Sequence, residues 1–585
     1  MNRILLAAIF LSSLLSCNQQ NKVAKTEGAD QSFETFKQQF VEKLWEMNPG
    51  WATSQGYHKY DSVLLIPGPE EDKLVLAFAD SVDTWLQQWK PETLSAANKT
   101  DWQLIKNYAD ATRFYINEFK GGEWNPSNYN VGGAIFDVID NRNAALDIKL
   151  RAINAKLKNV PAFFEAARKI VHNPTREHTQ LAIDQNKGSL YFFNTVLPDS
   201  LGVSNLSAEE KQEMQKNIAA AKTAVDGYVS WLEKEVQPTL KDSARSFRIG
   251  KELYEKKFKL DVNSQYSASE MYKKAEERKA FLTAEMAKLT EQLWPKYFAK
   301  TQMPADKPTA IRMMIDEISK QHCHRDSFLQ TIEWQLPQLT AFITTHNIIN
   351  LDSTKPLKVR KTPEYMEGGG AGASINSPGP YDKDAATYYN VSLLTDYTKE
   401  DAESYLREYN DYVLQILNIH EAIPGHYTQL IYANRSPSII KSIFGNGAMI
   451  EGWACYVERM MMEEGYNDSP EMWLFYYKWN MREACNFILD YNIHCNNWSE
   501  QQVKDLLVKE AFQQEAEAKG KYKRATLTQV QLTSYFTGLT EIYELREEIK
   551  KKQADKFDLK KFHEQFLSYG SAPVKDIRAL MLSGN

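Results

Sequence analysis

Two histidines and a glutamate stand close together in the segment NIHEAIPGHYTQ, residues 418–429. Neutral imidazoles are common ligands of zinc, and a glutamate beside a ligand can deprotonate a metal-bound water. These residue types therefore predict a metal site with His420 and His426 as ligands and Glu421 as general base. A single histidine in a helix would more simply be a partly buried side chain, but the whole string favours the metal site.

The spacing of the two histidines requires a break in the helix. In the string H-E-x-x-H the histidines are one helical turn apart and face one metal, whereas His420 and His426 are six residues apart. An unbroken helix would place His426 about 120° around and about 9 Å further along the axis. Pro424 lacks an N–H and clashes with the carbonyl of His420, and Gly425 supplies backbone freedom. We therefore expect a break at Pro424 and Gly425 that returns His426 towards His420.

A catalytic zinc ion usually has three protein ligands and one open position. The candidate third ligand is Glu451 in the string GAMIEGWACYVERMMMEEG, 25 residues beyond His426. On the helix expected there, Glu458 shares a face with Glu451 and would accept a hydrogen bond from a ligand histidine. The alternative for Glu458 is a solvated helix charge. Two imidazoles and a carboxylate favour one Zn²⁺ per chain.

The motif HExxPGH followed by EGWA resembles the bacterial lipoprotein family catalogued as domain of unknown function 885, which is grouped with the zincin metallopeptidases. The glutamate ligand is similar to that of the gluzincin branch, and its spacing is similar to that of thimet-type oligopeptidases. The resemblance extends over most of the chain and includes NPGWATSQGYHKYD (48–61) and RIGKELYEKKF (248–258). It implies a large helical zincin-like metallopeptidase that hydrolyses peptides rather than folded proteins.

Two further segments match the family pattern. The string MREACNFILDYNIHCNNWS resembles R…D…GIH…W, with Asn492 where glycine is common. The resemblance implies that Arg482 or His494 binds a substrate carboxylate or the oxyanion, and an internal ion pair is the alternative for Arg482. In VQLTSYFTGLTEIYELRE, Tyr535 would donate a hydrogen bond to the tetrahedral intermediate, as tyrosine does in related gluzincins. Aromatic core packing is the alternative for Tyr535.

Helical periodicity dominates the chain, with apolar residues at three- and four-residue spacing. The expected helices span residues 31–47, 143–170, 207–236, 267–298 and 397–420. Strands are expected in AGASI and TYYNVSLL, within residues 367–394, although a glycine-rich surface loop is the alternative. The sequence thus predicts a mainly α fold with a small β-sheet beside the active-site cleft, where an extended peptide could pair with a strand.

The N-terminus has the form of a bacterial lipoprotein signal. A short basic start precedes an apolar run, and the string LLSC resembles a lipobox in which Cys17 is lipidated. An ordinary secretory signal is the alternative. We expect a signal peptide (1–16), a polar tether (17–30), an N-terminal helical region (31–245) and a catalytic region (246–585). This organisation predicts a lipid anchor in the bacterial cell envelope, facing the periplasm or the cell surface.

The composition argues against several other classes of protein. A net charge of −6 gives no basic field for nucleic acid, and five cysteines in 585 residues are no disulfide framework. Two functions other than peptide hydrolysis remain open. One is a non-catalytic surface lipoprotein that binds peptides or metal, and the other is a metal-dependent hydrolase of a non-peptide amide or ester.

Overall fold

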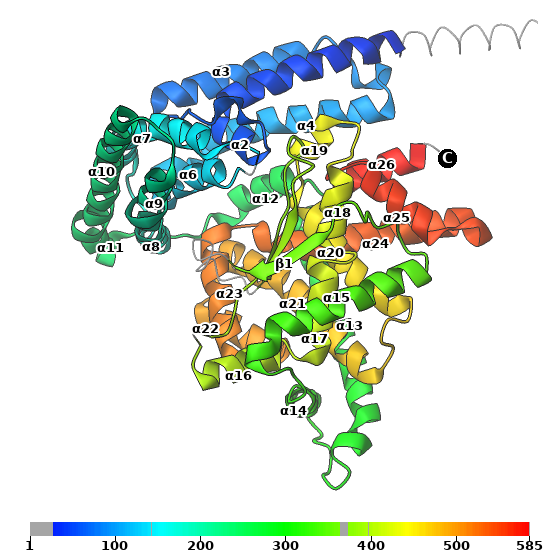
Figure 1. Cartoon of the computed structure of the whole chain (residues 1–585). Coiled ribbons are helices and arrows are strands. Elements are labelled where there is room, and N and C mark those ends of the chain that lie inside the picture. Colours follow the sequence, from blue (N-terminus) through cyan, green and yellow to red (C-terminus); the bar gives the residue numbers. More distant parts are fainter. Residues whose placement is uncertain (1–26, 142, 363–372, 396, 584–585) are drawn as a thin grey trace, which may run out of the picture.

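The structure is a computed structural model that describes residues 27–141, 143–362, 373–395 and 397–583. The expected signal peptide, Cys17 and most of the expected tether lie outside the described residues. Most described residues are helical, as Figure 1 shows, so the prediction of a mainly α fold is confirmed.

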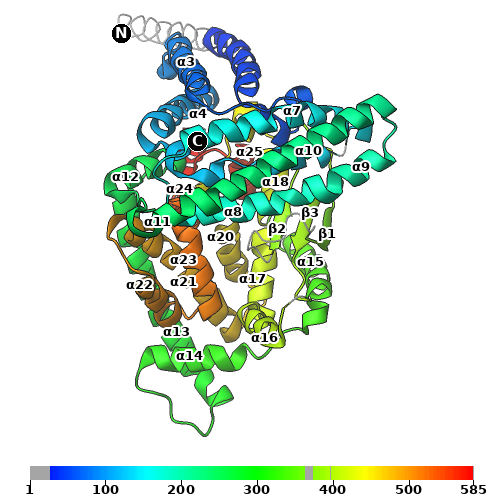
Figure 2. The same cartoon turned by 90° about the vertical axis from the view of Figure 1, so that its left-hand side faces the viewer.

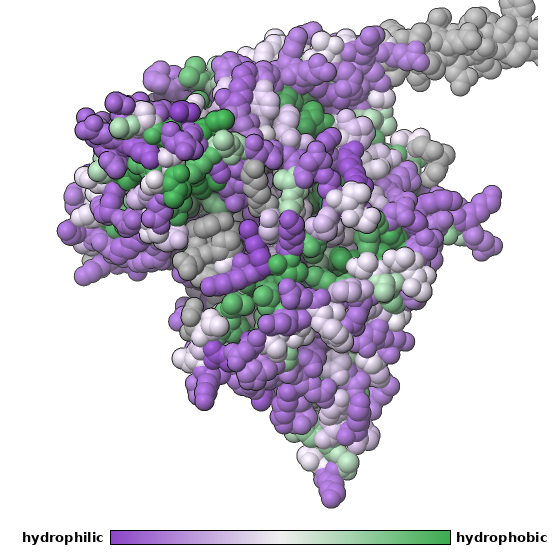
Figure 3. All heavy atoms as spheres, in the orientation of Figure 1, coloured by the Kyte–Doolittle hydropathy of each residue, from purple (hydrophilic) through white to green (hydrophobic). Residues whose placement is uncertain are grey.

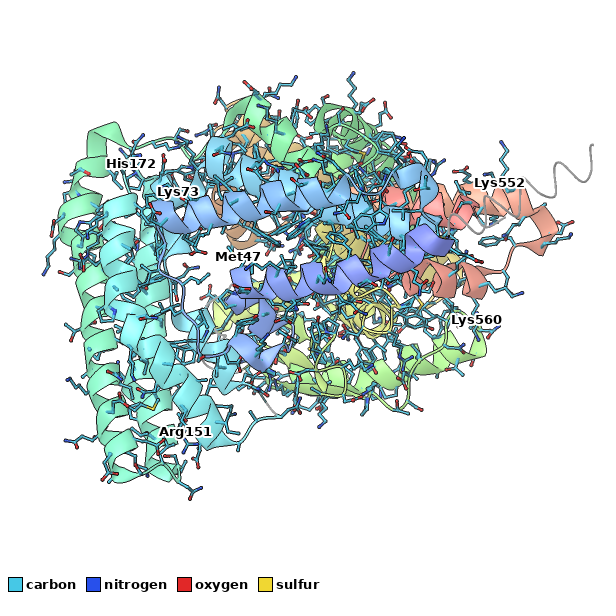
Figure 4. All side chains as sticks on the ribbon, turned by 90° about the horizontal axis from the view of Figure 1, so that it is seen from above. Met47, Lys73, Arg151, His172, Lys552 and Lys560 are labelled. Atoms are coloured by element: carbon cyan, nitrogen blue, oxygen red, sulfur yellow. The ribbon has the colours of Figure 1, made fainter. Side chains whose placement is uncertain are left out.

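The N-terminal part begins with a helix over residues 27–47. After it come α2 (Pro49–Ser54), α3 (Pro69–Leu86), α4 (Ala96–Arg113), α5 (Gly121–Trp124), α6 (Gly132–Ile139), α7 (Leu146–Ile170), α8 (Arg176–Tyr191), α9 (Leu197–Val203), α10 (Ala208–Trp231) and α11 (Gln237–Ser243). Seen from above in Figure 4, Arg151 lies near the start of α7 and His172 lies just beyond its end, both at the side of the molecule away from Lys552 and Lys560.

The remaining helices include the three that carry the predicted metal ligands, α17, α18 and α20. In chain order, the remaining helices are α12 (Gly250–Asp261), α13 (Ala268–Tyr297), α14 (Lys307–Ile318), α15 (Phe328–Thr345), α16 (Lys399–Glu408), α17 (Asp411–Glu421), α18 (His426–Ala433), α19 (Ile439–Ile443), α20 (Gly447–Glu463), α21 (Pro470–Cys495), α22 (Glu500–Lys504), α23 (Glu515–Thr528), α24 (Ser534–Gln553), α25 (Leu559–Ser568) and α26 (Val574–Ser583).

Local capping explains where several helices begin. Helices α10 and α13 start at capping boxes, in which Ser207 and Ser267 exchange hydrogen bonds with Glu210 and Glu270. The helix expected over 397–420 is instead two helices, α16 and α17. The side chain of Asn410 accepts hydrogen bonds from the first backbone N–H groups of α17 and so starts a new helix there.

A three-stranded sheet lies beside α17, with the order β1-β3-β2. Strand β2 (Ala373–Asn376) runs antiparallel to β3 (Thr387–Val391), and β1 (Leu357–Lys361) runs parallel to β3. The two strands predicted from AGASI and TYYNVSLL are present. Strand β1 was not predicted, because its basic sequence LKVRK becomes favourable only through pairing with β3, where the Arg360 guanidinium lies 4.0 Å from the centre of the Tyr388 ring.

The apolar residues form two large cores. One lies within residues 129–232, and the other joins residues 33–109 to residues 247–581. The first core therefore lies inside the predicted N-terminal region, whereas the second core spans both predicted regions. The predicted domain boundary between residues 245 and 246 stays a prediction. Figure 2 shows α17 and α20 between the sheet on one side and α21 and α23 on the other.

The surface seen in Figure 3 is mostly hydrophilic, with small apolar groups between charged side chains. Among the described residues, no helix combines the length and the apolar character needed to cross a membrane.

Candidate metal centre

The helix that carries His420 breaks where the sequence predicted. Helix α17 ends at Glu421, α18 begins at His426, and the Ile423–Pro424 peptide bond between them is cis. Gly425 lies so close to α17 that a Cβ there would be 1.8 Å from the carbonyl oxygen of His420. The Trp453 indole on α20 donates a hydrogen bond to the Pro424 carbonyl at 2.9 Å, which holds the turn against that helix.

This turn brings three predicted ligands together. The Nε2 atoms of His420 and His426 lie 3.7 and 3.5 Å from the same carboxylate oxygen of Glu451, with the two rings nearly perpendicular at 87°. Two ligand atoms each about 2.1 Å from a tetrahedral zinc ion are separated by about 3.4 Å. The side chains are 9, 12 and 21% exposed, so the group is buried but reachable from solvent. Its geometry and its donor atoms fit a zinc ion.

Glu458 lies behind His420. Its Oε1 atom is 2.7 Å from His420 Nδ1 and accepts a hydrogen bond from Trp479 Nε1 at 3.0 Å, and the side chain is fully buried. The reading of Glu458 as a solvated helix charge is therefore wrong. A proton on His420 Nδ1 leaves the Nε2 lone pair for a metal, and a distance of 2.7 Å is that of a hydrogen bond.

A second donor group shares His420 and consists of His420, Cys455 and Glu458. Burial, then the nearby Glu483 and Glu458 carboxylates, raise the pKa of the Cys455 thiol well above its usual range. Because thiols bind metals as thiolates, this group is the poorer candidate. The group of His420, His426 and Glu451 leaves the His420–Glu458 hydrogen bond intact.

The charges of the ligands are strongly coupled. Burial by itself lowers the pKa of His420, but its contacts with Glu451 and Glu458 outweigh this, and the net shift is upward. Burial raises the pKa of the Glu451 carboxyl, and the two histidines more than reverse that shift. The three side chains therefore stabilise a positive charge that lies between them. A divalent metal ion would supply that charge in place of the protons.

Glu421 is the last residue of α17, directly after the ligand His420. Burial raises the pKa of its carboxyl above the usual value, and the two histidines partly oppose this. A raised pKa favours the role of a general base, because the conjugate acid can then return the proton to a leaving group.

Tyr535 is the second residue of a neighbouring helix, α24, and lies beside the ligands. Its ring is stacked 6.5 Å from the His420 ring between centroids, and its hydroxyl accepts a hydrogen bond from Arg524 at 3.0 Å. Burial raises the pKa of Tyr535 to about 12, so the phenol keeps a proton to donate. The ring also packs against the main apolar core, so both interpretations of Tyr535 stay open, and its catalytic role stays a prediction.

Two glycines set the distance between Glu451 and Tyr535. Helices α20 and α24 cross at Gly452 and Gly538, where a Cβ on Gly538 would lie 1.7 Å from the Ala448 carbonyl oxygen. Each glycine is one to three residues from a predicted site residue. The sequence analysis did not identify this contact, and the small residues in EGWA and SYFTG were its only local signal.

His494 occupies a different place from the ligand group. It is 1% exposed, and its Nε2 atom is hydrogen bonded to the Ala525 carbonyl at 3.0 Å. Nearby, Asp490 accepts hydrogen bonds from the Val530 N–H at 2.9 Å and from the Tyr254 hydroxyl at 2.6 Å. Val530 has a φ of 71°, which is unusual for a β-branched residue, so these bonds hold a strained turn just before Tyr535. This position gives His494 a structural setting, and its predicted catalytic role stays a prediction.

Arg482 forms the internal ion pair that was its alternative reading. One of its terminal nitrogens lies 2.7 Å from Glu517 on α23, and its guanidinium lies 4.7 Å from the centre of the Trp479 ring. Trp479 in turn donates to Glu458, so the Trp479 ring and the Glu458 carboxylate lie between Arg482 and the predicted ligand His420.

The fold and this donor group define a class of large, mainly helical proteins with a buried His, His and Glu cluster at a helix break. The chain belongs to a family described as "Bacterial protein of unknown function (DUF885)", whose profile matches residues 49–581. No curated protein matches the chain.

Two solved structures resemble the whole chain. A protein from Shewanella oneidensis, provisionally described as a lipoprotein of unknown function, is 49% identical, with a TM-score of 0.85 over 94% of this chain and 99% of that one. A protein from Colwellia psychrerythraea, provisionally described as a lipoprotein, is 18% identical, with a TM-score of 0.76 over 95% of this chain and 99% of that one. The second likeness concerns the fold alone.

Proposed function

We propose that this protein is a zinc-dependent peptidase. The observation that carries the proposal is the position of Glu451, whose one carboxylate oxygen lies 3.5 and 3.7 Å from the two histidine Nε2 atoms. This spacing is close to the separation of ligand atoms in a tetrahedral zinc site. The hydrogen-bonded Glu458 and the adjacent Glu421 support a site built for chemistry.

The residues around the ligands have separable roles. Zinc bound by His420, His426 and Glu451 would polarise the peptide carbonyl and acidify water. Glu421 takes a proton from the attacking water and returns it to the leaving amine. Tyr535 donates a hydrogen bond to the oxygen that gains negative charge, and Arg524 orients the tyrosine hydroxyl.

The sheet offers a place for an extended peptide. Among the strands that the structure describes, β2 lies at an edge of the sheet, with β3 as its neighbour in the order β1-β3-β2. Tyr389 on β3 donates a hydrogen bond to Asn418 on α17 at 2.9 Å, two residues before His420. Strand β2 also contacts α17, so a peptide that pairs with β2 would lie near the helix that carries His420.

The description of the Shewanella oneidensis protein as a lipoprotein supports an envelope location. We place the protein on a membrane surface, held through lipidated Cys17 and facing the periplasm or the cell exterior.

Metal content and hydrolysis together test this function. Purified protein equilibrated with zinc should contain about one zinc per chain by mass spectrometry of the metal, and His420→Ala, His426→Ala and Glu451→Ala should each lose it. Glu421→Gln should keep the zinc and lose about 100- to 10,000-fold in peptide cleavage. Glu464→Gln, an exposed glutamate at the end of α20, is the matched control and should retain both.

Three results would count against the proposal. Absence of stoichiometric zinc would contradict the proposed metal site. Full activity in Glu421→Gln would contradict the role of Glu421 as general base. Bound zinc without cleavage of any member of a peptide library would favour a binding lipoprotein or a hydrolase of another amide or ester.

A further inference from the structure

A cluster of basic residues lies beside Tyr535. Helices α21 and α23 bring together Arg482, Lys521 and Arg524, and we call these three residues the cation cluster. Glu517 is 2.7 Å from Arg482 and 3.6 Å from Lys521, so one carboxylate serves two of the cations. Arg524 donates its hydrogen bonds to neutral partners, the Gln531 side chain at 2.7 Å and the Tyr535 hydroxyl at 3.0 Å.

Three basic groups of the cation cluster share one carboxylate, Glu517. Burial lowers the pKa of Arg482, but Glu517 and Tyr409 more than reverse that shift, so the charge on Arg482 is stabilised. The Nη1 atom of Arg482 is buried and has no hydrogen-bond partner among the described residues. Burial, followed by the nearby Arg482, lowers the pKa of Lys521 to about 7. By contrast, the buried Lys478 is matched by Glu408 at 2.8 Å. A further anion beside Lys521 and Arg524 would therefore be stabilised by the cluster.

The cation cluster begins one side chain away from the ligands. Arg524 contacts the Tyr535 hydroxyl, and the Tyr535 ring is 6.5 Å from the His420 ring. Arg482 is 17% exposed and Glu517 is 26% exposed, so solvent and small solutes reach this group. A substrate whose scissile bond lies at the metal ligands would therefore reach the cation cluster with an anionic group a short distance along its chain.

We propose that Arg482, Lys521 and Arg524 bind the carboxylate at the C-terminus of the substrate peptide, so that the protein is a carboxypeptidase. The inference rests on the proposed peptidase function. Guanidinium groups bind carboxylates through paired, charge-assisted hydrogen bonds, which suits two arginines around one carboxylate. Hydrolysis adds one water across the peptide bond, giving a new carboxylate on the N-terminal product and an amine on the short C-terminal product that carries the recognised carboxylate.

Matched peptides test the carboxylate directly with the unmodified protein. We would compare an acetylated peptide with a free C-terminal carboxylate against the same sequence with a C-terminal amide. Loss of a charge-assisted pair at a partly buried site should lower kcat/KM for the amide by about 100-fold. Mass spectrometry of the products should show cleavage within a few residues of the free C-terminus.

A third peptide distinguishes the two sources of a carboxylate. It ends in an amide but carries aspartate as its last residue. Cleavage of this peptide as fast as the free acid would show that a side-chain carboxylate suffices, and would overturn the assignment as a carboxypeptidase. Cleavage at less than a tenth of that rate supports recognition of the chain terminus.

Variants on α23 locate the effect. Lys521→Met replaces a lysine that is 4% exposed and should raise KM for the free acid about 10-fold, with little change for the amide. Lys523→Met, two residues away and exposed, is the matched control and should behave as the wild type. Both variants should keep their zinc, which separates a change in substrate binding from damage to the metal site.

The outcomes separate this inference from the proposed function. Equal kcat/KM for the acid and the amide, with cleavage at internal bonds, would overturn the carboxylate site and leave a zinc peptidase. Cleavage of none of the three peptides, nor of a peptide library, by zinc-loaded protein would overturn both. An unchanged KM in Lys521→Met would show that Lys521 does not bind the substrate carboxylate.

Discussion

The close approach of Gly425 to the helix that carries His420 offers a sharp perturbation, Gly425→Ala. A Cβ at Gly425 would lie 1.8 Å from the His420 carbonyl oxygen and 2.3 Å from that of Ile419. Real Cβ atoms do not approach closer than 3.0 Å, and both obstacles are backbone atoms that cannot rotate away. The turn must therefore move by roughly 1 Å or more.

A movement of this size should disrupt metal binding. Zinc sites tolerate ligand displacements of about 0.2 Å, and Gly425 immediately precedes the ligand His426. We expect zinc affinity to fall by at least the loss typical for an outer-sphere partner, about 10- to 100-fold. The strain should also lower the free energy of unfolding of the metal-free protein by about 1–3 kcal/mol.

The assay combines zinc titration against a competing chelator with urea denaturation of the metal-free protein. Gly188→Ala is the matched control, since a Cβ there meets nothing within 4 Å inside α8. It should leave zinc affinity unchanged and should not destabilise the protein. Wild-type affinity and stability in Gly425→Ala would refute the close approach, and loss of stability with normal affinity would refute the link to His426.

Two other predictions concern the buried polar groups. Glu458→Gln should lower zinc affinity by about 10- to 100-fold in chelator competition, whereas Cys455→Ser should leave it unchanged, and the reverse order would favour the donor group that contains the thiol. The pKa of His58 is raised from 6.5 to about 9, mainly by its hydrogen bond to Asp61 and also by its hydrogen bond to Asp382. The contribution of His58 to the free energy of unfolding is therefore complete below pH 6.5 and is lost as the pH rises through 9. In urea denaturation at several pH values, His58→Asn should remove about 1–3 kcal/mol of this pH dependence. If the free energy of unfolding falls equally with pH in the variant and the wild type, the role of the ion pair is contradicted.

The helix break was predictable because its causes are local. Pro424 and Gly425 act on backbone atoms within five residues, so the sequence alone indicates where α17 must end. Helical spacing also indicated that Glu451 and Glu458 share one face of α20. The choice between a hydrogen bond to a ligand histidine and a solvated charge for Glu458 required the packing of α20 against α17, which the sequence alone does not give.

The cation cluster was not predictable in the same way. Arg482 stood out within a motif, but Lys521 and Arg524 lie in an ordinary charged helix, EAEAKGKYKRATLT. Lys519 and Lys523 on that helix are exposed, and only packing against α21 shows which lysine is buried. Strand β1 was missed for the same reason, since a long-range partner decides its conformation.

The segments that resemble the family without carrying ligands have a common structural role, which is to hold the two sides of the metal centre. In RIGKELYEKKF, Tyr254 bonds to Asp490 and so supports the turn before Tyr535. In NPGWATSQGYHKYD, the Gln55 carbonyl accepts a hydrogen bond from the Tyr381 N–H at 3.2 Å, in the loop that joins β2 to β3.

The second of these segments also packs closely against that loop. A Cβ on Gly379 would lie 2.4 Å from the Gln55 carbonyl oxygen, and His58 Nε2 lies 2.9 Å from Asp382. The N-terminal segment thereby fixes the loop behind the edge strand β2. Because Tyr254 supports the opposite side, the proposed peptide-binding edge and the proposed oxyanion donor are both positioned from outside the metal-binding helices. Rigid support of this kind is what a site with separately placed ligands, base and hydrogen-bond donor requires, since each group must be positioned to well under 1 Å.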